Sequence, residues 1–204
     1  MNMRKFAPTL IFLLLFVWLM NPRQIHAQSL TNLGEKVLSS TAKAPGDKSD
    51  YYYFGVETQQ HLTNFSEPEV TANVSGSDYN PATAPGGTEP FKTGAVFHNS
   101  EEASTKLFSF TLTNEAEPNF NVYFLVNNVT NPDFDTTSIT IESYVNNELS
   151  ATQTQTVTPG EGINTYVGFS VQKATKGMEF RVYTNGGVAG DHQAVGGVTF
   201  LAVR

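Results

Sequence analysis

The chain has 204 residues, contains no cysteine, and carries 19 acidic side chains against 12 basic ones, for a formal net charge of −7. This length suits one domain, or two very small ones. The lack of cysteine excludes disulfides, thiolate metal sites and a cysteine nucleophile. The acidic balance argues against a nucleic-acid partner, because phosphate binding needs clustered lysine and arginine.

Residues 1–27 predict a secretory signal peptide. Arg4 and Lys5 form a basic start, Leu10–Met20 form an apolar run of 11 residues, and cleavage is expected after Ala27. That run is shorter than the ~20 residues of a membrane-spanning helix, although an uncleaved signal anchor is the alternative. Cleavage leaves 177 residues, with 9 basic against 19 acidic side chains. We therefore expect an acidic mature protein, without a membrane span, that is secreted, extracellular or periplasmic.

The N-terminal part of the remaining chain shows little periodicity. We expect residues 28–50 to form an N-terminal segment or linker, in which residues 29–37 are a short helix or a strand. A β-sandwich domain is then expected over residues 51–204. Within it, residues 67–94 hold four prolines and four glycines, which predicts a long irregular loop. A stretch of this kind inside a domain is usually functional or mobile.

The rest of the chain alternates apolar and polar residues in the period of two that is typical of β-strands. Strands are expected near Phe108, Phe120–Val126, Ile139–Val145, Val167–Val171, Phe180–Val182 and Val198–Ala202. Turn residues separate them, with no helical pattern between. The sequence thus predicts an all-β fold, an antiparallel β-sandwich of jelly-roll type. Residues 151–158, which alternate threonine with glutamine and valine, predict an edge or solvated strand.

The end of the chain resembles the last hairpin of many secreted bacterial β-sandwich domains. The resemblance covers a strand at Met178–Thr184, a glycine-rich loop, and then Gly196–Phe200. It implies the same fold and carries no catalytic motif. A bacterial source also agrees with an exported chain that lacks cysteine.

Tyrosines are the candidate binding residues. A tyrosine on a sheet surface offers a rigid, amphipathic plane that stacks on sugar rings or on a partner protein. The candidates are Tyr51, Tyr53, Tyr79 and Tyr183. In the run from Tyr51 to Phe54, alternate residues face opposite sides of a strand, so one pair is expected to be buried.

A calcium site is a second candidate. Asn131, Asp133 and Asp135 place oxygen-bearing side chains at alternate positions, as a calcium loop does. Two features depart from that pattern: asparagine stands first, and Thr136 occupies the place of the glycine that the loop needs. The alternative interpretation is a proline-initiated turn between two strands.

Catalytic motifs are missing from the sequence. It holds no nucleophile elbow, no zinc-binding helix motif and no phosphate loop. Its close acidic pairs, Glu101–Glu102 and Glu115–Glu117, fall in polar loops, and Asp191–His192 falls in a glycine-rich loop. We therefore expect a non-catalytic binding or surface-associated module with a glycan or a cell-surface component as partner. The alternatives are a small secreted jelly-roll hydrolase or lyase acting on polysaccharides, and a structural or assembly subunit.

Overall fold

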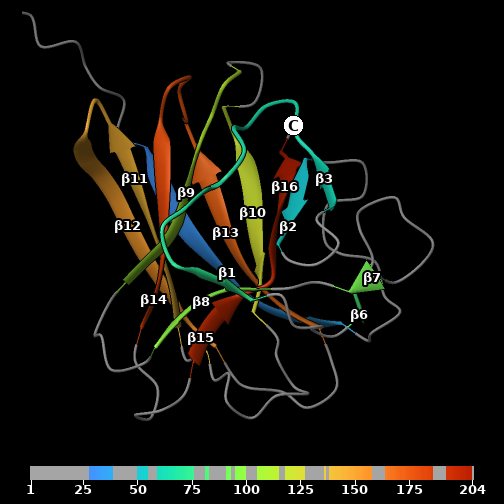
Figure 1. Cartoon of the computed structure of the whole chain (residues 1–204). Helices are drawn as coiled ribbons and strands as arrows, with labels where there is room; N and C mark the ends of the chain where they lie inside the picture. The colour runs from blue at the N-terminus through green and yellow to red at the C-terminus, as the bar shows by residue number, and fades with distance from the viewer. Residues whose placement is uncertain are drawn as a thin grey trace, which may run out of the picture.

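Alternating apolar residues build two antiparallel sheets that face each other across one core (Figure 1). The computed structural model describes residues 28–38, 50–54, 59–75, 81–82, 91–92, 95–99, 105–114, 118–126, 136, 138–157, 164–185 and 192–203. Within these ranges the only regular elements are β-strands, and every strand pair is antiparallel. The all-β, antiparallel prediction is confirmed there. The predicted signal-peptide helix lies outside the described residues.

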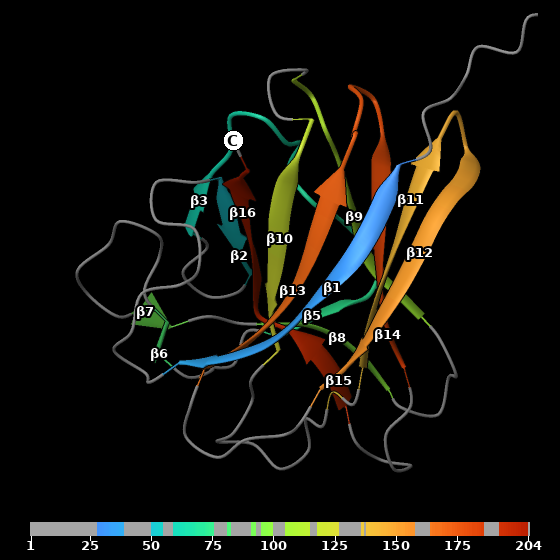
Figure 2. The ribbon, with the colours of Figure 1, turned by 180° about the vertical axis from the view of Figure 1, so that it is seen from behind.

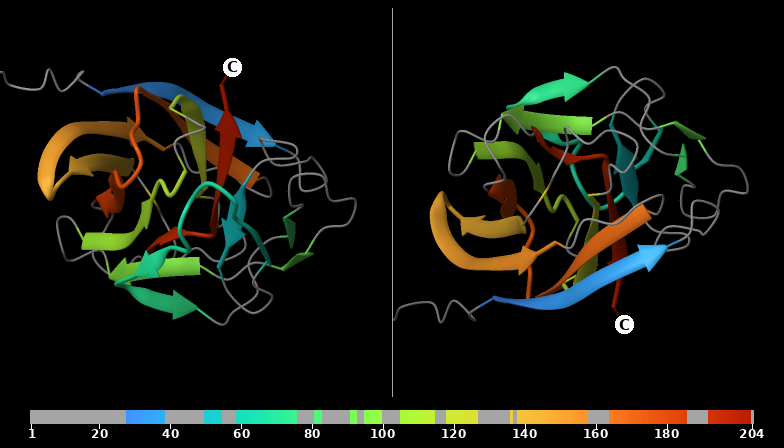
Figure 3. Two further views of the ribbon diagram at one scale, coloured as in Figure 1. Left: turned by 90° about the horizontal axis from the view of Figure 1, so that it is seen from above. Right: turned by 90° about the horizontal axis from the view of Figure 1, so that it is seen from below.

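Each large sheet is named after a central strand. The β10 sheet contains, in spatial order, β1 (Ser29–Leu38), β13 (Asn164–Gln172), β10 (Phe120–Leu125), β16 (Gly197–Ala202), β2 (Tyr51–Tyr53) and β3 (Gln59–His61). The β14 sheet contains β12 (Glu148–Thr156), β11 (Ser138–Val145), β14 (Glu179–Asn185), β9 (Thr105–Thr111) and β4 (Glu69–Val70). Figure 3 shows the two sheets from both ends of the sandwich.

The chain passes repeatedly from one sheet to the other. In chain order, β9 lies in the β14 sheet and β10 in the β10 sheet, and β11 and β12 return to the β14 sheet. β13 then lies in the β10 sheet, β14 in the β14 sheet and β16 in the β10 sheet. Together with β2, this places β2–β16–β10–β13 against β9–β14–β11–β12. That arrangement of eight strands is the connectivity of a jelly roll.

The core between the sheets is unusually aromatic. Phe120 of β10 and Phe180 of β14 meet with ring centroids 5.6 Å apart and so bridge the two sheets. Phe65, from the segment between β3 and β4, stacks on Phe200 of β16 with centroids 3.9 Å apart. Edge-on and offset ring pairs of this kind add stability beyond the area they bury. Since one face of each strand is used for this core, the other face is available for other contacts.

Two segments differ from the sequence-based expectation, and one open alternative is decided. Residues 29–38 form strand β1, which is the strand of the two expected alternatives, because their backbone pairs with β13. Residues 67–94 hold four short strands where a loop was expected: β4, β5 (Asn73–Ser75), β6 (Pro81–Ala82) and β7 (Phe91–Lys92). The glycine-rich loop before the last strand contains β15 (His192–Val195), which pairs with β8 (Ala95–Asn99). β1, β4 and β15 pair with strands that are distant in sequence, so local periodicity did not reveal them.

One edge of the sandwich is closed by contact between the two sheets. β1 and β12 are the edge strands there, and Figure 2 shows β1 lying between β13 and β12. Asn32 on β1 donates from Nδ2 to the carbonyl oxygen of Thr154 on β12 at 2.8 Å. The prediction that residues 151–158 form an edge strand is confirmed for residues 151–156. Within the described part of the chain, no helix has the length and apolar character needed to cross a membrane.

Candidate functional site

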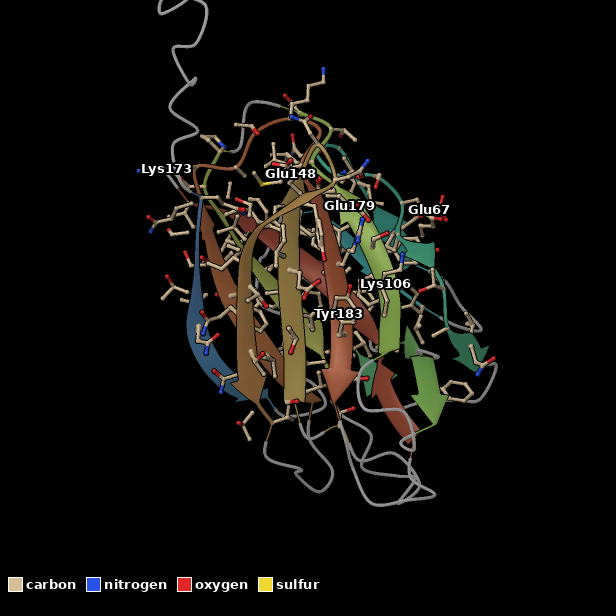
Figure 4. The ribbon with its side chains drawn as sticks, turned by 90° about the vertical axis from the view of Figure 1, so that its left-hand side faces the viewer. Glu67, Lys106, Glu148, Lys173, Glu179 and Tyr183 are labelled. Carbon is tan, nitrogen blue, oxygen red and sulfur yellow. The ribbon has the colours of Figure 1, made fainter. Side chains whose placement is uncertain are left out.

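Aromatic and charged side chains lie on the outer face of the β14 sheet, where Figure 4 labels Glu179 and Tyr183. The even-numbered residues of β14 and the odd-numbered residues Ile139, Ile141 and Ser143 of β11 are buried toward the core. The residues between them therefore point outward. In the strand register, Glu142 lies opposite Arg181 and Tyr144 lies opposite Glu179. We call Glu142, Tyr144, Glu179, Arg181 and Tyr183 the Tyr–Arg face.

Arg181 is held by neighbours on two sides. Its Nε and Nη2 atoms donate to the two carboxylate oxygens of Glu179, each at 2.9 Å. Its Cζ atom lies 3.8 Å from the ring centroid of Tyr144, a cation–π contact. The side chains of Arg181 and Glu179 remain 27% and 25% exposed. The guanidinium thus fixes the Tyr144 ring, and its own charge is already paired.

Glu142 connects the two tyrosines of the face. The Tyr144 hydroxyl donates to Oε2 of Glu142 at 2.7 Å. Glu142 and Tyr144 also lie close enough to the Tyr183 hydroxyl to raise its pKa. Glu142 thus lies near both hydroxyl groups, while the register places Tyr144 opposite Glu179 and Tyr183 opposite Thr140.

The contacts within the Tyr–Arg face shift several pKa values away from neutrality. Partial burial, followed by the charge of Glu142, raises the pKa of Tyr183 well above its ordinary value. The hydrogen bond to Glu142 raises the pKa of Tyr144. The hydrogen bond from Arg181 lowers the pKa of Glu179 below its ordinary 4.5. At neutral pH both tyrosines are thus protonated and Glu179 is ionised, so none of the three titrates near neutrality.

Hydroxyl groups and one lysine extend the face on both sides. On β12, Thr152 and Thr154 lie opposite Glu142 and Thr140, and the hydroxyls of Thr140 and Thr154 are 2.8 Å apart. On β9, Lys106 lies opposite Tyr183, as Figure 4 shows. Four strands at about 4.8 Å spacing make this surface roughly 14 Å wide. It combines two aromatic rings with hydroxyls and a carboxylate, which suits a ligand that has both apolar faces and hydroxyl groups.

Two of the predicted tyrosines, Tyr51 and Tyr53, lie on the opposite side of the molecule, on the outer face of the β10 sheet. Tyr53 is 0% exposed, and its hydroxyl lies 3.0 Å from that of Tyr166. Burial raises the pKa of Tyr53 well above its ordinary value. The half-buried Tyr51 stacks on His61, with ring centroids 6.1 Å apart. Tyr51 and Tyr183 thus belong to different surfaces, and Tyr53 offers no ring face to a ligand.

The other predicted site residues lie outside the described residues. They are Tyr79, Asn131, Asp133 and Asp135, so the fourth tyrosine and the calcium site stay predictions. Within the described ranges, no group of three or more histidine, aspartate or glutamate side chains is arranged to hold a metal ion. The backbones of two histidines come close through strand pairing, where His192 lies opposite Asn99, the residue after His98.

Of the Tyr–Arg face, only Tyr183 was predicted from the sequence as a binding residue, and Arg181 and the two carboxylates were missed. Glu142 and Glu179 each sit at an outward position of an alternating strand, and that signal is present in the sequence. What it does not contain is the pairing of β11 with β14, which brings Glu142 next to Arg181. The register of two strands separated by some forty residues is a tertiary property.

No protein-family model and no curated protein matches this chain. Two solved structures that resemble it contain the CBM51-2 and INT domains of ZmpB from Clostridium perfringens, the first in complex with GlcNAc. The first has a TM-score of 0.36 and 14% identity and covers 69% of this chain and 30% of the other. The second has a TM-score of 0.35 and 10% identity and covers 85% of this chain and 40% of the other. The chain thus spans less than half of either, and a likeness of this size carries no argument about function.

Proposed function

We propose that this protein is an exported, non-catalytic β-sandwich module that binds a glycan on the Tyr–Arg face. One observation carries the proposal: the partly exposed Tyr144 and Tyr183 lie on one outer face, where Glu142 and Arg181 hold the Tyr144 ring and the charge of Glu142 acts on the Tyr183 hydroxyl. A sugar ring has an apolar face edged by hydroxyls, and tyrosine matches it with a flat ring and a polar tip. Because these rings are ordered in the free protein, binding costs less conformational entropy.

The charges of the face favour an uncharged glycan. The charge of Arg181 is compensated by its two bonds to Glu179, so it offers little net attraction to a sulfate or a uronate group. Glu142 adds a carboxylate between the two tyrosines, and the whole chain has a formal net charge of −7. Anionic polymers are therefore expected to be repelled.

The same pKa shifts support binding over catalysis. A glycosidase needs one carboxylic acid whose pKa is raised so that it donates a proton near neutral pH. Glu179 shows the opposite shift. A lyase that uses tyrosine as a base needs a pKa near the working pH, whereas the pKa values of Tyr144 and Tyr183 are raised above 10.0.

The test is a glycan screen of the exported protein against neutral, sulfated and uronate-containing polysaccharides, followed by calorimetry on any ligand found. We expect binding to a neutral glycan. Tyr183→Ala and Tyr144→Ala should each weaken it about tenfold, which is ~1.4 kcal/mol. Tyr183→Phe should keep most of the affinity, because the ring is retained. Tyr51→Ala is the matched control, since it removes a half-buried tyrosine from the opposite surface.

Two results would contradict the proposal. One is the absence of binding to any glycan together with turnover of a polysaccharide. The other is a ligand whose affinity depends on Tyr51 and is unchanged by both substitutions on the Tyr–Arg face. Circular dichroism spectra of each variant show whether a loss of binding reflects a loss of fold.

A further inference from the structure

The first described residue carries a buried amide without hydrogen-bond partners. Gln28 is 7% exposed, and within the described part of the chain neither its Oε1 nor its Nε2 atom has a partner. The large majority of buried side-chain polar atoms do have one. The next residue, Ser29, already pairs with Gln172 of β13. Residue 28 therefore directly precedes the paired end of β1, and in the full chain its side chain is not free in solvent.

The predicted leader cleavage falls immediately before this residue. A cut after Ala27 gives Gln28 a free α-amine, which is charged at neutral pH. The pairing of Ser29 holds the charged α-amine close to a buried side chain. Removing that charge from water is costly. An N-terminal glutamine loses this charge when it cyclises, because its α-nitrogen and its amide carbon Cδ are correctly spaced to close a five-membered ring.

We infer that Gln28 becomes pyroglutamate once the leader is removed. The unprotonated α-nitrogen attacks Cδ, a new N–Cδ bond forms, and the Cδ–Nε2 bond breaks. Nε2 takes one proton from the α-nitrogen and leaves as ammonia. The reaction needs no oxidant, reductant or second substrate. It rests on the predicted cleavage after Ala27 and is independent of the glycan-binding proposal.

The lactam suits the observed position better than the open form does. It removes the α-amine charge, and it removes Nε2, one of the two unpartnered polar atoms. Because the folded position of Gln28 is buried, ring closure takes place before β1 docks. The folded state then favours the cyclised chain.

The experiment is mass spectrometry of the N-terminal peptide of the full chain after export from a secreting bacterium. The expected peptide begins at residue 28 and is lighter than its glutamine form by one ammonia. Gln28→Asn is the matched control: it keeps the amide, but its side chain is one carbon too short for the five-membered lactam. The N-terminal peptide of the variant should therefore show no loss of ammonia. The variant should unfold at a lower urea concentration than the cyclised protein.

Three results would overturn the inference. They are an exported chain that begins at residue 28 with a free amine, one that begins at another residue, and one that retains residues 1–27. Equal unfolding midpoints of the cyclised protein and the Gln28→Asn variant would overturn the structural reason for it.

Discussion

Alanine should be tolerated much less well at Gly197 than at Gly168. Both glycines lie in the β10 sheet beneath a tyrosine ring. A Cβ atom at Gly197 would lie 2.8 Å from Cε1 of Tyr53 and closer still to its Cδ1. A Cβ atom at Gly168 would lie 2.7 Å from Cε1 of Tyr123. Both distances are shorter than two carbon atoms can approach, so in each variant the ring has to move.

The cost differs because one ring is free to move and the other is not. Tyr53 is 0% exposed and is hydrogen-bonded to Tyr166. Its displacement adds overpacking of about 1–3 kcal/mol to the loss of a buried hydrogen bond worth ~1 kcal/mol. Gly197→Ala should therefore cost roughly 2–4 kcal/mol. Tyr123 is half-buried and swings toward solvent, and alanine recovers about 0.5–1 kcal/mol over glycine in a strand. Gly168→Ala should cost no more than ~1 kcal/mol.

The assay is urea unfolding followed by circular dichroism, with the free energy of unfolding extrapolated to water. A double-mutant cycle with Tyr53→Ala isolates the contact, because removal of the ring makes room for the new methyl group. The cost of the double variant should be smaller than the sum of the two single costs. The reasoning is refuted if Gly168→Ala costs as much as Gly197→Ala, or if the costs of Gly197→Ala and Tyr53→Ala add.

Three further predictions concern buried or paired polar groups. Tyr53→Phe removes the hydrogen bond to the buried Tyr166 hydroxyl and should lower the free energy of unfolding by about 1–3 kcal/mol. Asp50→Asn replaces a buried carboxylate that accepts hydrogen bonds from two backbone N–H groups at 2.9 and 2.6 Å. It should lower the free energy of unfolding by about 1–3 kcal/mol. For Glu179 the folded pKa is lowered by Arg181, so its stabilisation is present above its ordinary pKa of 4.5 and disappears as pH falls through the lowered value. At pH values above 4.5, Glu179→Gln should thus be less stable than wild type, by under ~1 kcal/mol. Below the lowered pKa of Glu179 the two proteins should be equally stable.

Each of these predictions is checked by urea midpoints, measured at neutral pH for the first two and across the acid range for the third. Glu148→Gln is a control for the third, because Glu148 is exposed and should show no comparable pH dependence. A Tyr53→Phe protein as stable as wild type would contradict the importance of the buried hydroxyl pair. Unchanged stability of Asp50→Asn would contradict the importance of the two hydrogen bonds that Asp50 accepts from backbone N–H groups. A Glu179→Gln deficit that persists unchanged at low pH would show that packing, and not charge, is lost.

The alternating pattern of single strands was sufficient to predict the class of fold and the outward direction of several site residues. Phe180 and Val182 mark the core side of β14, and this places Arg181 and Tyr183 outside. The threonine-rich strand β12 was predicted as an edge strand and is one. These features depend on a period of two along one strand, which is a local property of the backbone.

Strand pairing, which links residues distant in sequence, decided the rest. The register of β11 against β14 joins Glu142, Tyr144 and Arg181 into one face, and pairing with β13 makes residues 29–38 a strand. Alternation also showed that Tyr51 and Tyr53 share one side of a strand, but not that this side is covered. Tyr53 is buried because Gly197 lets its ring lie close to the neighbouring strand and because Tyr166 of β13 reaches its hydroxyl. Sequence alone thus determined which residues share a side of a strand, and only the tertiary structure decided what each side meets, because strand register and burial arise between strands.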